Sequence, residues 1–446
     1  MPRFDRTHTD DLAEYIRLSP TPYHACAVAG ERLEAAGFQR LREADAWPGD
    51  SGGYYVVRDG SIIAWRQSGK VESFRIFGAH TDSPTLKIKP RPDTGSGGWK
   101  QVACEVYGGV PRDTWLDRDL GVAGRLVMRD GSHVLVHVDR PVLRVPRLAI
   151  HLDRKVNEEG QRLNPQTQFT PVWGLGEPRE GEFLEFVSAE AGVEAEDVLG
   201  FDLFTAACDR PSYLGKDEEL FAAWRLDNLL STHAGLAALI AAEDTERTPV
   251  FVSFNYEEIG SMTYSAAQSP FLESVLRRIA GGDFERFARI TAASKMMSAD
   301  TGNALHPNYV ERHEPGHHPM PNGGPMIKVS ANQRYATGAE EQALFAAAAE
   351  RAGIPWQYYV NRNDIPGGTT IGPISGTQLG MLTVDVGAPI LSMHSSRELC
   401  GADDPAYLAD LALGLHTCEL RPVRWSHPRP SPRRRLRSRN FARRRY

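Results

Sequence analysis

Apolar residues recur with a helical period near the N-terminus and with an alternating period in the segments that follow. Residues 8–18 and 23–36 carry apolar positions three and four apart, and we expect both to form amphipathic helices. The run YYVVRDGSIIAWR predicts a β-hairpin that turns at Asp59 and Gly60. A short apolar strand, SFRIFGAH, then ends at His80. The N-terminal part therefore combines helices with a sheet.

The pattern changes in the middle of the chain. The stretch PRPDTGSGG interrupts the strands with Pro, Gly and Ser and predicts a domain boundary near residues 90–98. From there to about residue 224 short alternating segments prevail, among them AGRLVMRDGSHVLVHVD, a second Asp-Gly hairpin. Because the flanking segments share a different character, we expect residues 91–224 to form an inserted β-rich domain.

Helices and strands alternate in the remainder of the chain. Residues 228–243 have one apolar face and predict a helix, and residues 250–254 predict a buried strand. EEQALFAAAAERAG predicts a further helix, and MLTVDVGAPILSMHS predicts one or two strands. This alternation predicts an α/β fold with parallel strands, built from residues 1–90 and 225–420.

Composition is that of an ordinary globular protein, with 41% apolar and 24% charged residues. No apolar stretch reaches the length of about 18 residues that a membrane span needs. The N-terminus, MPRFDRTHTDDL, lacks the apolar core of a secretory signal, and five scattered cysteines without a CxxC pair suit a reducing compartment. We therefore expect a cytoplasmic protein of two or three domains, with no membrane partner.

Charge is distributed unevenly along the chain. Residues 421–446 contain eleven arginines and no acidic residue, so the rest of the chain carries −17 although the total is −6. This Arg-rich tail has no apolar periodicity, and we expect it to be disordered. The alternative is a tail that binds nucleic acid through its phosphates without sequence preference. We favour the disordered tail and do not expect nucleic acid to be a partner.

The first candidate catalytic residues lie in the segment PVFVSFNYEEIGSM, residues 249–262. Its strand ends just before Glu257 and Glu258, two adjacent carboxylates. Like charges repel, so burying both is costly unless a cation lies beside them. Ligands collect at the carboxyl ends of strands in open α/β sheets, which favours a functional site here. For an isolated Glu-Glu pair, a solvated surface loop is the commoner explanation.

Other potential metal ligands also follow predicted strands or open predicted helices. They are His80, Asp82, Asp227, Asp300 and His394. Zinc accepts imidazole nitrogens and carboxylate oxygens, and one carboxylate can bridge two metals about 3.5–4 Å apart. One acid must remain free to take the proton of the attacking water. Each residue taken singly also has an ordinary explanation as a core histidine or a cap, and spacing alone does not show that they converge.

Many short strings occur in the order found in one known family. They include SPTPYHA, GAHTDSP, WLDRDLGVAGR, RLDN, EEIGS, SADTGNALHPNY, NGGPMIKVSANQRYAT and DVGAPILSMHSSRELCG, and the match runs from about residue 8 to about residue 418. The chain resembles the aspartyl aminopeptidases, which are co-catalytic zinc exopeptidases. The resemblance implies an aminopeptidase domain with a mixed central sheet flanked by helices, interrupted by a β-rich dimerisation domain. It also implies a tetrahedral homododecamer that releases N-terminal Asp or Glu from peptides.

The resemblance further implies a site for two divalent metal ions. His80 and Asp300 would bind one ion. Glu258 and His394 would bind the other, and Asp227 would bridge the two. Zinc is the expected metal, and cobalt and manganese are alternatives because the same ligands suit them.

Four residues would act around these ions. Glu257 would be the general base and acid for the attacking water, and Asp82 would orient His80 by accepting its second ring N–H. His151, in AIHLD, would reach into the active site of a neighbouring subunit, contact the substrate there and stabilise the transition state. Lys328, in IKVSANQRY, would meet the acidic side chain of the substrate.

The specificity leaves alternatives open. Lys328 has an alternative role as a strand-edge lysine that discourages aggregation, and Arg334 is then the competing cation. Pro111 and Arg112 stand where the family usually has an apolar residue and a histidine, and SMTYSAAQSP also departs from the family pattern. An aminopeptidase with relaxed or neutral-residue specificity is therefore the first alternative. The alternative from another class is a catalytically inactive scaffold.

Overall fold

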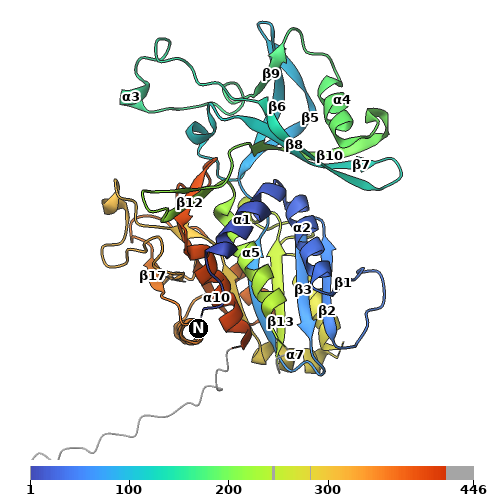
Figure 1. Ribbon diagram of the computed structural model, residues 1–446, viewed down its shortest axis with the longest axis vertical. Coiled ribbons are helices and arrows are strands. Elements are labelled where there is room, and N and C mark those ends of the chain that lie inside the picture. The colour runs from blue at the N-terminus through green and yellow to red at the C-terminus, as the bar shows by residue number, and fades with distance from the viewer. Residues whose placement is uncertain (1, 244–246, 282, 418–446) are drawn as a thin grey trace, which may run out of the picture.

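The computed structural model describes residues 2–243, 247–281 and 283–417 and shows two units stacked along the long axis of the molecule (Figure 1). The larger unit is built on a nine-stranded sheet, and the smaller unit, at the top of Figure 1, is built on a six-stranded sheet. Within the described ranges, the structure contains no helix that is long and apolar enough to cross a membrane. The Arg-rich tail lies outside the described residues.

The nine-stranded sheet is mixed. Its strands are, in spatial order, β1 (Phe38–Arg40), β2 (Gly52–Arg58), β3 (Ser61–Gln67), β13 (Thr248–Phe254), β4 (Phe74–His80), β14 (Lys295–Ala299), β18 (Leu382–Gly387), β16 (Met326–Val329) and β17 (Gln357–Val360). The four central strands β13, β4, β14 and β18 are parallel, while β3 and β16 pair antiparallel on either side of them. The parallel centre places the carboxyl ends of four strands at one edge.

Helices cover both faces of this sheet (Figure 1). One face carries α1 (Arg6–Leu18), α2 (Pro22–Ala35), α5 (Leu226–Ala241), α8 (Ala339–Ala352) and α10 (Asp404–Thr417). The other carries α6 (Phe271–Ala280), α7 (Phe284–Ala293) and α9 (Ile371–Leu379). Successive residues of β13 face opposite layers, so Phe251 packs in the first core and Val250 and Val252 in the second. The buried strand that the sequence predicted for residues 250–254 is thus confirmed.

The six-stranded sheet is antiparallel and has a core of its own. Its strands are, in spatial order, β8 (His133–Leu143), β7 (Leu120–Met128), β10 (Val198–Ala207), β5 (Thr85–Ser96), β6 (Trp99–Tyr107) and β9 (Val172–Leu175). Helix α4 (Glu182–Ala191) packs on it through Phe183 and Val187. The mixed α/β architecture with a β-rich insertion is confirmed.

The structure also contains a five-stranded sheet that the sequence did not predict. It consists of β11 (Ser212–Leu214), β12 (Leu220–Ala223), β20 (Glu398–Gly401), β19 (Pro389–Leu391) and β15 (Gly302–Asn303). The remaining short elements are α3 (Val156–Glu159), η1 (Arg112–Trp115), η2 (Ala195–Asp197), η3 (Glu257–Ile259) and η4 (Val310–Arg312).

The stretch expected to mark a boundary near residues 90–98 is part of a strand and its turn. The chain leaves the nine-stranded sheet at His80 and enters the six-stranded sheet at Thr85, before that stretch begins. The two prolines at positions 90 and 92 fall where the pairing of β5 with β6 is interrupted, between Ile88 and Asp93. Their missing N–H groups therefore cost no ladder hydrogen bond, and the composition marks a bulge.

Candidate metal centre and substrate cavity

Parallel strands bring three distant parts of the sequence to one edge of the nine-stranded sheet. Strand β4 ends at His80, which is in register with the last residue of β13. Asp300 directly follows β14. After β13, Tyr256 adopts a left-handed conformation with φ of 68°, and this turn starts η3 with Glu257 and Glu258. The carboxylates and the histidine thus project from neighbouring strand ends.

Two further residues reach the same edge from other elements. Asp227 opens α5, and His394 follows β19 with φ of 66°. Asp227 lies between two histidines, with Oδ1 3.2 Å from His80 Nε2 and Oδ2 3.2 Å from His394 Nε2. One carboxylate therefore faces both imidazole rings.

Two groups of three potential ligands share Asp227. In the first, His80 Nε2 lies 3.6 Å from Asp300 Oδ1. In the second, His394 Nε2 lies 3.4 Å from Glu258 Oε1. Within each group the ligand atoms all lie within 4.8 Å of one another. The structure brings these five residues together in the two groupings that the resemblance implies.

The donor set fits divalent metal ions. The Nδ1–H groups of His80 and His394 donate to the backbone carbonyls of Asp82 and Gly109, at 3.1 and 3.2 Å, which leaves both Nε2 atoms facing carboxylates. Among the described residues, the buried atoms Asp227 Oδ1 and Glu258 Oε1 accept no hydrogen bond of normal geometry. Imidazole nitrogens and orphaned carboxylate oxygens that converge in this way are ligands for zinc.

The electrostatics of the cluster also favour bound cations. Burial, and then the charge of Asp227, raise the pKa of Glu258 well above its usual range. Burial alone would lower the pKa of His394, but its contact with Asp227 and the charge of Glu258 raise it to about 10. Without bound cations these groups therefore tend to hold protons, and positive ions would take the place of those protons.

Glu257 lies beside the first group without belonging to it. Its Oε2 is 3.9 Å from His80 Nε2, and a third combination of His80 with both glutamates also meets the 4.8 Å distance. Burial, together with the charges of Asp300 and Asp82, raises the pKa of Glu257 to about 8. A carboxyl group with a pKa near neutrality can both accept and return a proton.

Asp82 supports the glutamate turn, and its contact with His80 is made by its backbone carbonyl. The ring N–H of His80 is donated to the backbone carbonyl of Asp82, because the carboxylate lies farther away at 3.6 Å. The carboxylate instead accepts the Tyr107 hydroxyl at 2.7 Å and the backbone N–H groups of Glu257 and Glu258 at 3.0 and 3.1 Å. Three donors thus occupy the oxygens that were expected to orient the imidazole.

Sequence reasoning missed a further buried acid, whose carboxylate binds the backbone of two of the potential ligands. Glu398, in β20, is 2% exposed and accepts the backbone N–H of Asp227 at 2.9 Å and that of His394 at 2.6 Å. Burial raises its pKa to about 8. Arg225 similarly donates to the backbone carbonyl of Thr81 behind the cluster. The only signal in the sequence was that Glu398 is an acid in an otherwise apolar strand, four residues after His394. Its partners are backbone groups, which no pattern of side chains reveals.

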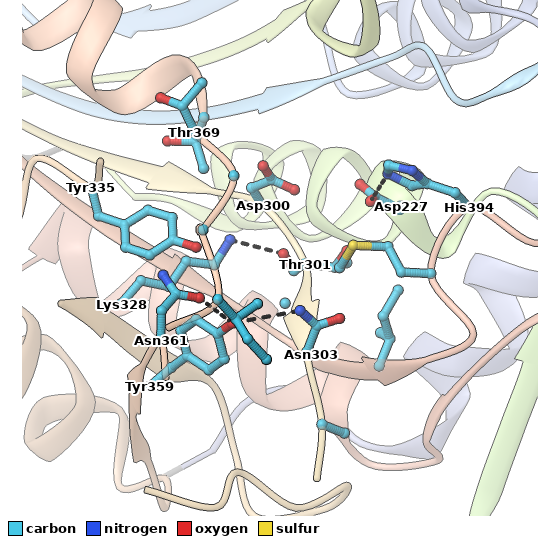
Figure 2. Close-up of a pocket in the computed structure, with 18 of the residues that line it drawn as sticks. Asp227, Asp300, Thr301, Asn303, Lys328, Tyr335, Tyr359, Asn361, Thr369 and His394 are labelled. Atoms are coloured by element: carbon cyan, nitrogen blue, oxygen red, sulfur yellow. Dashed lines mark hydrogen bonds and ion pairs between the residues drawn. The ribbon is translucent and has the colours of Figure 1, made fainter. Parts of the chain in front are cut away.

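A cavity of about 800 Å³ opens beside the cluster. Figure 2 shows Lys328, from β16, directed into this cavity, with Nζ donating to the Thr301 carbonyl at 2.8 Å. Burial alone would lower the pKa of Lys328, but the nearby charges, first that of Asp300 and then those of Tyr335 and Asp385, together outweigh burial and raise this pKa. The ammonium therefore stays charged. It uses one of its three donors on Thr301.

The other two candidate residues lie outside this cavity. His151 is in an exposed loop of the six-stranded unit, between Ile150 and Leu152, whose side chains are 48% and 76% exposed. It is not among the described residues that line the cavity of its own chain. Arg334 is exposed and does not line the cavity either, although its neighbour Tyr335 does.

The chain belongs to the aminopeptidase I zinc metalloprotease family (M18), whose family model matches residues 15–412. Among its curated relatives is a probable M18 family aminopeptidase 2 of Streptomyces coelicolor, which is 55% identical over 419 residues and covers 92% of this chain and 97% of that protein. The Mycobacterium tuberculosis protein of the same description is 48% identical over 414 residues, covering 89% and 94%. The family resemblance noted in the sequence is thereby confirmed.

Solved structures show the same fold. A chain in the cryo-EM structure of the Ape4 and Nbr1 complex superposes with a TM-score of 0.88 at 36% identity, covering 92% of this chain and 86% of that chain. The S. cerevisiae mApe1 dodecamer superposes with a TM-score of 0.80 at 27% identity, covering 92% and 96%. An M18 aminopeptidase from Thermotoga maritima, 23% identical, shares the fold with a TM-score of 0.83.

Proposed function

We propose that this protein is an aminopeptidase that uses two metal ions, zinc in the first instance, to release N-terminal Asp or Glu from peptides. The observation that carries the proposal is the pair of ligand groups that share Asp227, with Glu257 beside them. Membership of a zinc metalloprotease family supports the choice of metal.

His80 and Asp300 would hold one ion, Glu258 and His394 the other, and Asp227 would contact both. Two divalent ions bound there would polarise the scissile carbonyl and lower the pKa of a water molecule. Glu257 would take the proton of the attacking water and deliver it to the nitrogen of the leaving amine. Asp82 would keep Glu257 in place by accepting its backbone N–H.

Lys328 would select the acidic side chain of the substrate. Its ammonium is buried, charged and directed into the cavity that also contains the ligand clusters (Figure 2). A substrate carboxylate would accept hydrogen bonds from the donors that Thr301 leaves free. The exposed Arg334 lies outside this cavity, which favours Lys328 over it.

The same proposal includes a cytoplasmic homo-oligomer, most simply a dodecamer, with His151 acting in a neighbouring subunit. The mApe1 relative is a dodecamer. His151 is exposed in a loop and does not line the cavity of its own chain. Mixing inactive Glu257→Gln protein with inactive His151→Ala protein should restore activity when subunits exchange, because some mixed sites contain both residues. Exchange without recovered activity would refute the in-trans role.

Metal analysis combined with turnover of chromogenic substrates tests the function. We expect two metal ions per chain and faster cleavage of Asp- and Glu-capped substrates than of Ala- and Leu-capped ones. Preference for the neutral substrates would support the relaxed aminopeptidase instead. A metal-free protein that remains inactive after zinc, cobalt or manganese is supplied would support the inactive scaffold.

A further inference from the structure

Tyr107 connects the six-stranded unit to the metal centre of its own chain. It is the last residue of β6, it is 8% exposed, and its ring packs edge-on against Phe204 of β10 at a centroid distance of 5.7 Å. Its hydroxyl donates to Asp82 Oδ2 at 2.7 Å, across the junction between the two sheets. The Tyr107 ring therefore packs in the six-stranded unit, while its hydroxyl donates to a residue at the edge of the nine-stranded sheet.

The acceptor of this hydrogen bond controls the position of Glu257. Asp82 is buried and accepts the backbone N–H groups of Glu257 at Oδ1 and Glu258 at Oδ2. These two N–H groups begin η3, whose start and end are left-handed at Tyr256 and Gly260. The turn has no side-chain cap of its own, so Asp82 is the group that satisfies its first donors.

The residues that follow Tyr107 contact the second ligand group. The backbone carbonyl of Gly109 accepts the Nδ1–H of His394 at 3.2 Å, and Trp115 Nε1–H is donated to the His394 carbonyl at 3.4 Å. Gly108 has φ of 75°, and a side chain there would come within 3.3 Å of Glu258 Cβ. The segment from Tyr107 to Trp115 therefore lies against both parts of the site.

We propose that Tyr107 is a positioning residue that acts through Asp82 to hold the Glu257–Glu258 turn. The six-stranded unit then supports catalysis within its own chain, in addition to any contact it makes between subunits. The inference rests on the proposed function, since it concerns the position of the general base. It assigns a role to Tyr107, four residues before the Pro111–Arg112 pair at which the chain departs from its family.

Tyr107→Phe tests the proposal because it removes one hydroxyl and keeps the ring. We expect kcat on an Asp-capped substrate to fall about 10- to 100-fold with KM nearly unchanged and with full zinc content, since hydrogen bonds to charged groups are worth this much. The matched control is Tyr55→Phe, because the Tyr55 hydroxyl also donates to a carboxylate at 2.7 Å, that of Glu34, away from the site. Both variants should lose similar melting temperature, but Tyr55→Phe should keep its kcat. Equal kcat for the two variants would overturn the proposal.

A double-variant cycle separates positioning from general stability. If Tyr107 acts through Asp82, then Tyr107→Phe combined with Asp82→Asn should lose no more kcat than Asp82→Asn alone, whereas additive losses would refute the pathway. If Asp82→Asn turns over too slowly to assay, the wild type, the two single variants and the double variant can be compared by their zinc affinity, measured by chelator competition. Glu257→Gln distinguishes failure of the proposed function from failure of the role of Tyr107. A fully active Glu257→Gln protein would refute the proposed function. An inactive Glu257→Gln protein together with a normal Tyr107→Phe protein would refute the role of Tyr107 alone.

Discussion

Two groups of charged residues in this chain, one largely buried and one half-buried, differ in composition. The strand-end cluster comprises His80, Asp82, Asp227, Glu257, Glu258, Asp300 and His394. The inter-unit cluster comprises Asp59, Lys87, Arg125 and Asp202, and joins the β2–β3 turn of the nine-stranded sheet to β5, β7 and β10 of the six-stranded sheet. Both connect segments far apart in the sequence, yet only the second contains equal numbers of acids and bases.

The two clusters also differ in how their charged groups are paired. In the inter-unit cluster, Arg125 lies 2.6 Å from Asp59 and 2.9 Å from Asp202, and Lys87 lies 2.7 Å from Asp202, so each acid has a cationic partner from the chain. In the strand-end cluster five carboxylates face two histidines, and buried oxygens of Asp227 and Glu258 accept no hydrogen bond. A balanced buried cluster can be purely structural, whereas an unbalanced one indicates cations supplied from outside.

Glu257→Gln gives the largest effect expected from this difference. The amide keeps the size of the side chain but cannot take a proton, so kcat should fall about 10²- to 10⁴-fold. Metal content should stay at the wild-type level, because the five proposed ligands remain. Kinetics and metal analysis on the same preparation check both parts, and wild-type kcat with full metal content would remove Glu257 from its role.

Arg125→Met should break the balanced cluster without touching the chemistry. Asp59, whose side chain is 1% exposed, then loses its cationic partner, while Asp202 keeps Lys87. An uncompensated buried charge costs about 3–5 kcal/mol of unfolding free energy. Urea unfolding measures this loss, and kcat per folded protein should change far less than in Glu257→Gln. The matched control is Arg140→Met, because Arg140 pairs with Glu190 on the surface and should contribute about 1 kcal/mol or less. Equal losses from both substitutions would show that the inter-unit cluster is not stabilising.

Lys328→Met should alter specificity more than stability. The thioether keeps the length and apolar packing of the side chain but deletes the charge, so kcat/KM for Asp and Glu substrates should fall by about 2–5 kcal/mol in transition-state free energy. Ala and Leu substrates should be affected little or should gain. Arg334→Met is the control outside the cavity, and it should leave the Asp-over-Leu ratio unchanged. An unchanged ratio in Lys328→Met would exclude it as the selector.

The comparison also explains what the sequence could and could not predict. Apolar runs ending at His80 and before Glu257 indicate strand ends, because burial on both faces leaves a continuous apolar signal. That these strand ends meet Asp300 depends on the spatial order β13, β4, β14, which skips along the sequence and leaves no local pattern. Convergence could therefore be expected only from family resemblance.

Residues that act through backbone groups stayed hidden for a related reason. Glu398 binds two backbone N–H groups and Tyr107 reaches Asp82 across the junction of two sheets. Neither contact requires a particular spacing: Tyr107 lies 25 positions from Asp82, and Glu398 lies 4 positions from His394 and 171 from Asp227. The change of sheet after His80 was missed although Ser83-Pro84 is a breaker pair, because the denser run of Pro and Gly at residues 90–98, which contains the bulge of β5, was the stronger signal.

His416 represents a third way to bury an ionisable group, in which the group stays neutral. It is 1% exposed in α10, and burial is the main cause that lowers its pKa to about 4. Because the pKa in the unfolded chain is about 6.5, the unfolded state takes up a proton first as the pH falls. The stability contributed by neutral burial is therefore complete above about pH 6.5 and is lost as the pH falls towards 4. This is opposite to a histidine that gains a carboxylate partner.

His416→Leu should remove that dependence while keeping an apolar side chain in the core. We expect the urea unfolding free energy of the wild type to fall relative to that of His416→Leu below pH 6.5, by up to about 1.4 kcal/mol per pH unit, since the wild-type unfolded chain binds one more proton. Loss of metal at low pH affects both proteins alike, because the strand-end cluster is unchanged, so the difference between the two curves isolates His416. Curves that stay parallel from pH 7 to pH 4.5 would show that His416 takes up its proton equally in the folded and unfolded states, and neutral burial would be refuted. A wild-type protein that gains stability relative to the variant as the pH falls would place His416 with the histidines that have a carboxylate partner.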